Sequence, residues 1–135
     1  MSAQFELDLP PTADAPRRAR RRLLDWLGSA VSVPELKRAA LLTSELVTNA
    51  LMHGQGKISV RAQLDQDRLL VEVIDQGHGF ERTVTEHDFE DVGGHGLRIV
   101  EAEASRWGIH EGTTHVWFEL ERTGPRLGSD KKPAH

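Results

Sequence analysis

The sequence predicts an α+β domain in two layers, with a mixed and mainly antiparallel β-sheet covered on one face by about three helices. Two observations lead to this prediction. Five segments alternate apolar with polar residues or are rich in β-branched and aromatic residues, as strands are. Three other segments carry leucine or valine at helical spacing, so each presents an apolar face that can cover a sheet.

The first half of the chain contains one of the strands and two of the helices. Phe5–Leu9 alternates apolar and acidic residues and is expected to be a half-buried strand. A helix is expected from about Asp14 to a terminating glycine at position 28. A second and longer helix is expected to start at Ser32 or Pro34 and to end at Gly54.

The second half of the chain contains the other four strands and the last helix. Lys57–Leu64 and Arg68–Asp75 flank a short turn and should pair antiparallel. A helix is expected over Leu97–Ala102, where Leu97 and Val100 face inward. Trp107–His110 and His115–Leu120 then close the sheet as two further strands.

Two segments show no regular pattern. Residues 81–92 are polar and are expected to form a mobile loop. Residues 123–135 are rich in Gly, Pro and Lys and are expected to be a disordered tail. The predicted domain therefore covers residues 1–122.

Composition narrows the classes of function. The 135 residues carry a net charge of −4, which argues against broad binding to nucleic acid phosphates. No cysteine is present, so disulfide and thiolate chemistry are excluded, in keeping with a reducing cytoplasm. No apolar run approaches the roughly 20 residues of a membrane helix, and the start lacks the pattern of a signal peptide. We expect a cytoplasmic protein that contacts neither membrane nor nucleic acid directly.

Three sets of residues suggest functional roles but have plainer explanations. The basic run Arg17–Arg22 could bind a phosphate or an acidic partner protein, but such runs are more often the solvated face of a helix. The seven histidines match no zinc-binding spacing. Trp26, Trp107 and Trp117 are expected to be core residues rather than a stacking platform.

The long helix carries an unusual polar row. Glu45 and Asn49 are four residues apart and therefore project side by side from one face, and His53 extends the row by one more turn. The row lies beside an apolar stripe made by Leu42, Leu46 and Leu51. Taken alone, it is best explained as a solvated flank of the helix.

The downstream glycine motifs change that interpretation. Asp75 ends an apolar strand, where a partly desolvated carboxylate needs a donor such as the amino group of adenine. Gly77 and Gly79 let a flat ring approach the backbone closely. The glycine-rich segment 93–96 precedes a helix, where backbone N–H groups bind anions such as a triphosphate.

If a nucleotide binds at these glycine motifs, the polar row of the long helix can take part in metal binding and phosphoryl transfer. Asn49 offers an oxygen to Mg²⁺, and Glu45 can orient or deprotonate a nucleophile that attacks the γ-phosphate. Each motif is weak alone, since both glycine motifs also occur as turns and hinges. Neither the Walker nor the Rossmann glycine pattern fits the chain.

In order and form, the three motifs resemble the N, G1 and G2 boxes of the GHKL ATPases. That superfamily includes gyrase B, mismatch-repair ATPases, histidine kinases and the anti-sigma serine/threonine kinases. The chain is most similar to the anti-sigma kinases, in Ser44–Gly54 and in the ending Val116–Leu120. The three motifs are Glu45-x-x-x-Asn49, Asp75-x-Gly77-x-Gly79 and Gly94-x-Gly96.

The resemblance implies a Bergerat ATP-binding fold in which Glu45 is the catalytic base, Asn49 the Mg²⁺ ligand and Asp75 the adenine partner. The family usually has a threonine near the start of its last strand, whereas here His115 stands at that place and Thr114 precedes it. Because a slip of one residue turns a side chain to the other face of a sheet, either residue could contact the nucleotide. The other nucleotide contacts expected from the resemblance are Gly77, Gly79, Gly93, Gly94, His95, Gly96, Leu97 and Thr114.

The resemblance also implies an activity and partners. We expect an ATP- and Mg²⁺-dependent serine/threonine kinase, a homodimer, that phosphorylates an anti-anti-sigma protein of the STAS type and sequesters a sigma factor. The alternative from another class is a nucleotide-gated binding module without transfer activity, against which Glu45 argues. A catalytic fragment of a histidine kinase is disfavoured, because no helical hairpin with a phosphoacceptor histidine precedes the first strand.

Overall fold

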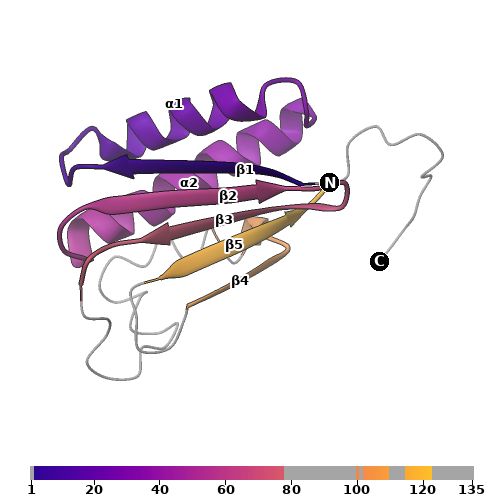
Figure 1. Ribbon diagram of the computed structural model, residues 1–135. Helices are drawn as coiled ribbons and strands as arrows, with labels where there is room; N and C mark the ends of the chain where they lie inside the picture. The colour runs from indigo at the N-terminus through magenta and orange to yellow at the C-terminus, as the bar shows by residue number, and fades with distance from the viewer. Residues whose placement is uncertain (1, 78–99, 101, 110–114, 123–135) are drawn as a thin grey trace.

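Five strands form one antiparallel sheet in the order β1-β2-β3-β5-β4, and two helices lie on one of its faces (Figure 1). This arrangement is seen in a computed structural model that describes residues 2–77, 100, 102–109 and 115–122. The elements, in chain order, are β1 (Ala3–Leu9), α1 (Ala15–Leu27), α2 (Val33–His53), β2 (Ile58–Leu64), β3 (Arg68–Ile74), β4 (Arg106–Ile109) and β5 (Val116–Glu121).

The sheet has one apolar and one polar face because its strands alternate. Along β2 every second residue is buried, and the register brings Ala62 opposite Phe5 on one side and Val71 on the other. Val71 in turn lies opposite Phe118, the largest fully buried side chain. Each such side chain stabilises the fold by roughly 1.5–3 kcal/mol through burial. This apolar face is the one that the helices cover, and we call the other the outer face.

Small residues let α1 lie close to the sheet and to α2. Its buried positions are Ala15, Ala19, Leu23 and Leu27, which are four apart and therefore form one stripe. Gly28 ends the helix with a φ of 53°, a left-handed conformation that a residue with a β-carbon rarely adopts.

A capping box sets the start of α2. The Ser32 backbone N–H donates to Glu35 Oε1 at 2.8 Å, and the Glu35 backbone N–H donates to Ser32 Oγ at 3.3 Å. Ser32 is therefore the N-cap, and the helix starts at Val33 rather than at Pro34. The capping box thus pairs two backbone N–H groups that would otherwise lack a partner at the start of α2.

Hydrogen bonds in the turn hold the β2–β3 hairpin. Asp65 Oδ1 accepts from the backbone N–H groups of Asp67 at 2.7 Å and Arg68 at 2.9 Å. These two bonds lower the pKa of the Asp65 carboxyl, since they favour its charged form. The antiparallel pairing predicted for these strands is confirmed.

The predicted α+β class is confirmed, with one difference of detail. Every strand pair in the described part of the chain is antiparallel, whereas the sequence suggested a mixed sheet. Of the third predicted helix, residues 100, 102 and 103 are described and are helical, and Val100 is buried as expected. The predicted loop 81–92 and tail 123–135 lie outside the described residues, so the domain boundary at 122 stays a prediction. No helix among the described residues is long and apolar enough to span a bilayer.

Candidate functional site

The carboxyl ends of α2 and β3 meet, and this junction brings two of the sequence-predicted groups together. Gly54 caps the end of α2, and Asp75 follows the last residue of β3. A β-carbon on Gly54 would lie 2.0 Å from Asp75 Oδ2 and 2.4 Å from its Cγ, which is closer than atoms can pack. The Asp75 carboxylate thus occupies the space that a side chain at position 54 would need.

Asp75 is held at this junction almost out of solvent. Its exposed fraction is 8 %, and its Oδ1 accepts from the Gly77 backbone N–H at 2.7 Å. A carboxylate oxygen has two acceptor sites, so Oδ1 can serve a second donor besides Gly77. The protein therefore orients this carboxylate, and its role as the adenine partner stays a prediction.

Asn49 lies on α2 about one turn before the junction. Its side-chain Nδ2 is buried and has no hydrogen-bond partner among the described residues. Leaving a buried donor unpaired costs about 1–3 kcal/mol, which a bound group with a free acceptor would offset. An orphaned carboxamide at this point fits a residue that binds a ligand rather than one that holds the helix in place.

Glu45 precedes Asn49 by one turn of α2 and is partly buried, as Asn49 is. Behind this row Leu42 and Leu46 are fully buried and Leu51 packs against the core, so the predicted apolar stripe is confirmed. Glu45 and Asn49 are therefore partly shielded from solvent by the core, unlike the fully solvated flank that the row suggested when taken alone. His53, in contrast, is exposed.

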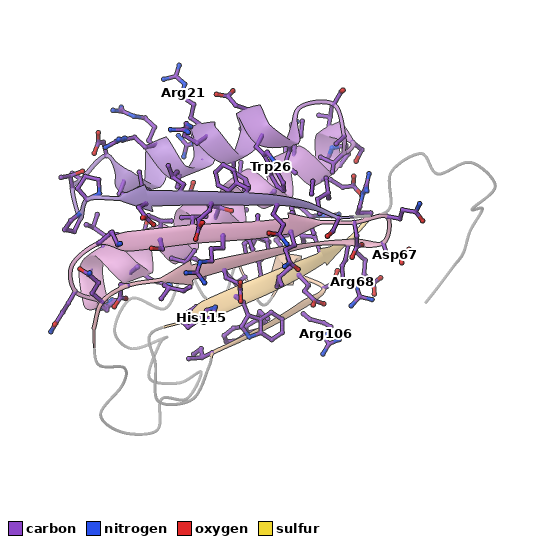
Figure 2. The ribbon with its side chains drawn as sticks, in the orientation of Figure 1. Arg21, Trp26, Asp67, Arg68, Arg106 and His115 are labelled. Carbon is purple, nitrogen blue, oxygen red and sulfur yellow. The ribbon has the colours of Figure 1, made fainter. Side chains whose placement is uncertain are left out.

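The residue before Glu45 ties the two helices together. Arg20 Nη1 of α1 donates to Ser44 Oγ of α2 at 3.1 Å. The other arginines of the basic run are exposed, and Arg21 points away from the sheet (Figure 2). The solvated-face interpretation of the run is confirmed for positions 17, 18, 21 and 22, whereas Arg20 has a structural contact.

His115 is turned away from the junction. Its Nε2 lies 2.9 Å from Glu72 Oε2 (His115 is labelled in Figure 2). Glu72 belongs to the outer face, where it stands opposite Arg61 of β2 and Trp117 of β5 in the sheet register. Of the two residues left open by the sequence, His115 is thus wrong for a nucleotide contact on the helix-covered side. The cause is the alternation of the strand, which places residues 115, 117 and 119 on one face.

Trp117 also departs from its expected place in the core. Trp26 and Trp107 pack against the core, and Trp26 contacts Phe5 with 5.3 Å between ring centroids. Trp117 instead covers Gly108 on the outer face, where a β-carbon would lie 2.9 Å from its ring. It is a partly exposed surface residue of the sheet.

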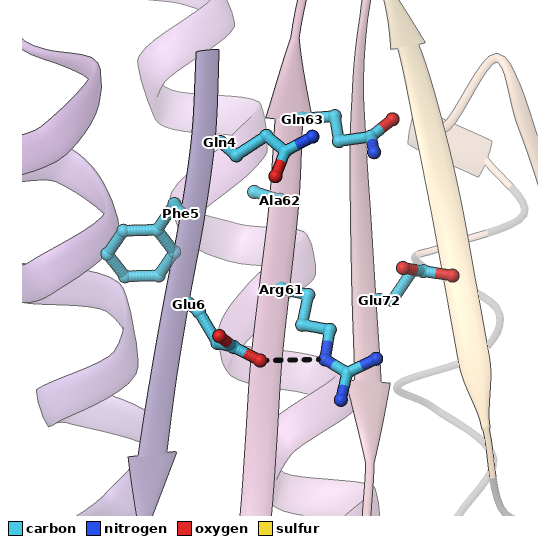
Figure 3. A pocket seen from close by; sticks show the side chains of 7 residues that line it. All are labelled: Gln4, Phe5, Glu6, Arg61, Ala62, Gln63 and Glu72. Carbon is cyan, nitrogen blue, oxygen red and sulfur yellow. Dashed lines mark ion pairs between the residues drawn. The ribbon is translucent and has the colours of Figure 1, made fainter.

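The outer face carries a shallow depression of about 480 Å³ (Figure 3). It is crossed by an ion pair of 3.1 Å between Arg61 Nε and Glu6 Oε2, both more than half exposed. Its lining residues are Gln4, Phe5, Glu6, Arg61, Ala62, Gln63 and Glu72. None of the predicted nucleotide residues lines it, and the sheet separates it from α2, so we do not assign it to the nucleotide.

The remaining predicted site residues lie outside the described part of the chain. They are Gly79, Gly93, Gly94, His95, Gly96, Leu97 and Thr114. Their assignment stays a prediction. Within the described residues, no three His, Asp or Glu side chains come together as a metal site.

Comparison with known protein families gives a match that extends over most of the chain. A sequence model of the histidine kinase-like ATPase domain matches residues 9–120, which is most of the chain. The match runs from the last residue of β1 to Leu120 in β5, and it includes α2 and the end of β3. No curated protein matches the chain significantly.

The position of His115 generates a prediction about nucleotide affinity. His115→Ala should change the dissociation constant for ATP by less than about twofold, because its side chain lies across the sheet from the junction. Isothermal titration calorimetry with Asp75→Ala as the positive control measures this. A loss of tenfold or more in His115→Ala would contradict the assignment of its side chain to the outer face.

Proposed function

The chain belongs to the histidine kinase-like ATPase domain family, within the GHKL superfamily, and we propose on that premise that it is a cytoplasmic protein serine/threonine kinase of the anti-sigma type. ATP binding follows from the family. The proposed substrate is a small anti-anti-sigma protein of the STAS type, and the proposed second partner is a sigma factor that the kinase, as a homodimer, sequesters.

One observation carries the proposal of phosphoryl transfer. Glu45 and Asn49 stand one turn apart on α2, and the end of the same helix touches Asp75. One helix thus positions the Glu45 carboxylate and the Asn49 carboxamide relative to the buried Asp75 carboxylate, the proposed adenine acceptor. A module that only bound the nucleotide would need Asp75 and Asn49 but would have no use for the carboxylate of Glu45.

The chemistry assigned to Glu45 is general base catalysis. Its carboxylate would accept the proton of a serine or threonine hydroxyl on the substrate while the hydroxyl oxygen forms a bond to the γ-phosphorus. The bond between the γ-phosphorus and the bridging oxygen breaks, and ADP leaves with that electron pair. The partial burial of Glu45 beside the core keeps the carboxylate on a rigid element, as positioning of a base requires.

Asn49 is the residue of this chain that would hold Mg²⁺. Its carboxamide oxygen is a suitable ligand, and its unpartnered Nδ2 would donate to a phosphate oxygen on the same ligand. Mg²⁺, when bound, neutralises charge on the phosphate oxygens. Because the Asn49 side chain is half-buried on α2, its position fixes where the metal and the phosphate oxygens would bind.

Support for the protein partners comes from residue likeness. Ser44–Gly54 and Val116–Leu120 resemble the anti-sigma kinases more than other branches of the superfamily. The first of these segments is the helix that carries Glu45 and Asn49. Its likeness therefore concerns the transfer step itself and favours a hydroxyl acceptor over a histidine acceptor.

Removal of Glu45 tests the transfer step. Glu45→Ala should bind ATP as the wild type does and should lose transfer of label from γ-labelled ATP to a purified STAS protein by about 10²–10⁴-fold, the usual contribution of a general base. Glu6→Ala, which removes an exposed carboxylate on the outer face, is the matched control. If Glu45→Ala transfers label at the wild-type rate, or if the wild type transfers none to any STAS protein, the nucleotide-gated binding module is the better account.

Removal of Asn49 tests the metal. Asn49→Ala should weaken binding of Mg·ATP by about thirtyfold and binding of ATP in the presence of EDTA by only about threefold, because the Nδ2 bond to phosphate is lost in both cases but the oxygen ligand matters only when the metal is present. Asn49→Asp, which keeps an oxygen at that place, should retain the preference for Mg·ATP. Titration calorimetry of the wild type and both variants, with Mg²⁺ and with EDTA, measures the six dissociation constants. Equal losses with and without metal would mean that Asn49 has a structural role.

A further inference from the structure

Two short segments are joined around Asp75 by contacts that the nucleotide motifs do not include. Gly54–Lys57 connects α2 to β2, and Asp75–Gly77 follows β3. The backbone N–H of Gln76 donates to Gln55 O at 2.8 Å, and the backbone N–H of Lys57 donates to Gln76 Oε1 at 2.8 Å. We call these two joined segments the α2–β3 clasp.

The two glycines of the Gly54–Lys57 segment leave space for side chains of the other segment. Gly54 has φ −97° and ψ −162°, which any residue can adopt, so its glycine is explained by the Asp75 carboxylate that fills the place of a β-carbon. Gly56 has a φ of 69° and a β-carbon there would lie 2.2 Å from Gln76 Oε1. Each glycine thus receives one side chain from the end of β3, Asp75 at position 54 and Gln76 at position 56.

The clasp restricts the Asp75 carboxylate from two sides. Oδ1 accepts from the Gly77 backbone N–H, and Oδ2 lies against Gly54. Two Gln76 bonds keep these segments together, one made by its backbone N–H and one by its exposed side chain. A rotation of the carboxylate would therefore need the clasp to open.

We infer that Gln76, Gly54 and Gly56 are positioning residues that set the direction of the Asp75 carboxylate and thereby the preference for adenine over other purine bases. This inference rests on the proposed function, in which Asp75 accepts from the adenine amino group. Hypoxanthine has an oxygen in place of that amino group, so a fixed acceptor at Asp75 disfavours it. A carboxylate that can turn accommodates both bases and discriminates less.

The test compares ADP with inosine diphosphate on the full chain. Their dissociation constants are measured by titration calorimetry with Mg²⁺ present, and the quantity of interest is the ratio of the two. In the wild type the ratio should favour ADP by about tenfold or more, because an unpaired buried acceptor is costly. A residue that only maintains the fold would weaken both nucleotides alike and leave the ratio unchanged.

Gln76 is the first position to vary, because its exposed side chain can be changed without disturbing the core. Gln76→Ala removes the acceptor for Lys57 and should reduce the preference for ADP by roughly threefold to tenfold. Gln76→Glu keeps an oxygen acceptor and should retain the wild-type ratio, even if its charge weakens both nucleotides. Gln66→Ala, in the exposed β2–β3 turn, is the matched control and should behave as wild type.

Gly54→Ala displaces the carboxylate directly and should reduce the preference for ADP by about tenfold. If Gly54→Ala fails to fold, as judged by its thermal unfolding midpoint, the ratio of the two dissociation constants in Gln76→Ala alone tests the inference. Unchanged ratios in Gln76→Ala and in folded Gly54→Ala, with a ratio near one in Asp75→Asn, would overturn the inference and leave the proposed function standing. A wild-type ratio in Asp75→Asn would contradict the adenine assignment itself, and the inference with it.

Discussion

The contact between the Asp75 carboxylate and Gly54 is the constraint on which the rest of the site depends. It brings the end of the central strand β3 against the end of α2. The position of Asp75 is thereby fixed relative to Glu45 and Asn49 on the helix. A buried carboxylate is stable only where donors and close packing are arranged for it, and here Gly77 supplies a donor. The sheet order, the capping box and the leucine stripe of α2 all act to hold this junction.

The sequence predicted the elements of this junction but not their contact. Helical spacing placed Glu45 and Asn49 on one face, and Gly54 was correctly expected at the helix end because glycine commonly ends helices. That Gly54 leaves room for Asp75 could not be predicted, since the two are 21 positions apart and their approach depends on how α2 crosses the sheet. The role of Gln76 was missed for the same reason, because nothing in its neighbours signals a partner at Lys57.

The outer face is where the structure adds most to the sequence interpretation. Trp117 was expected in the core because it is hydrophobic, and the choice between His115 and Thr114 was left open. His115 and Trp117 both lie on the polar side of the sheet. The alternation of a strand is easy to see in a sequence, but which set of alternate residues faces the core depends on the pairing register. A shift of one residue exchanges the two faces. In contrast, β2 and β3 carry long unbroken alternations, and every second residue of each strand is buried.

The central claim is that the nucleotide binds at the α2–β3 junction, on the helix-covered side of the sheet. Nuclear magnetic resonance of the ¹⁵N-labelled chain, titrated with a non-hydrolysable ATP analogue and Mg²⁺, tests it most directly. The account predicts large shifts for the Asn49 side-chain amide and the Gly54 and Gly77 backbone amides, with the Trp117 indole N–H unmoved. Shifts confined to Trp117 and the side-chain amide of Gln63, on the outer face, would contradict it.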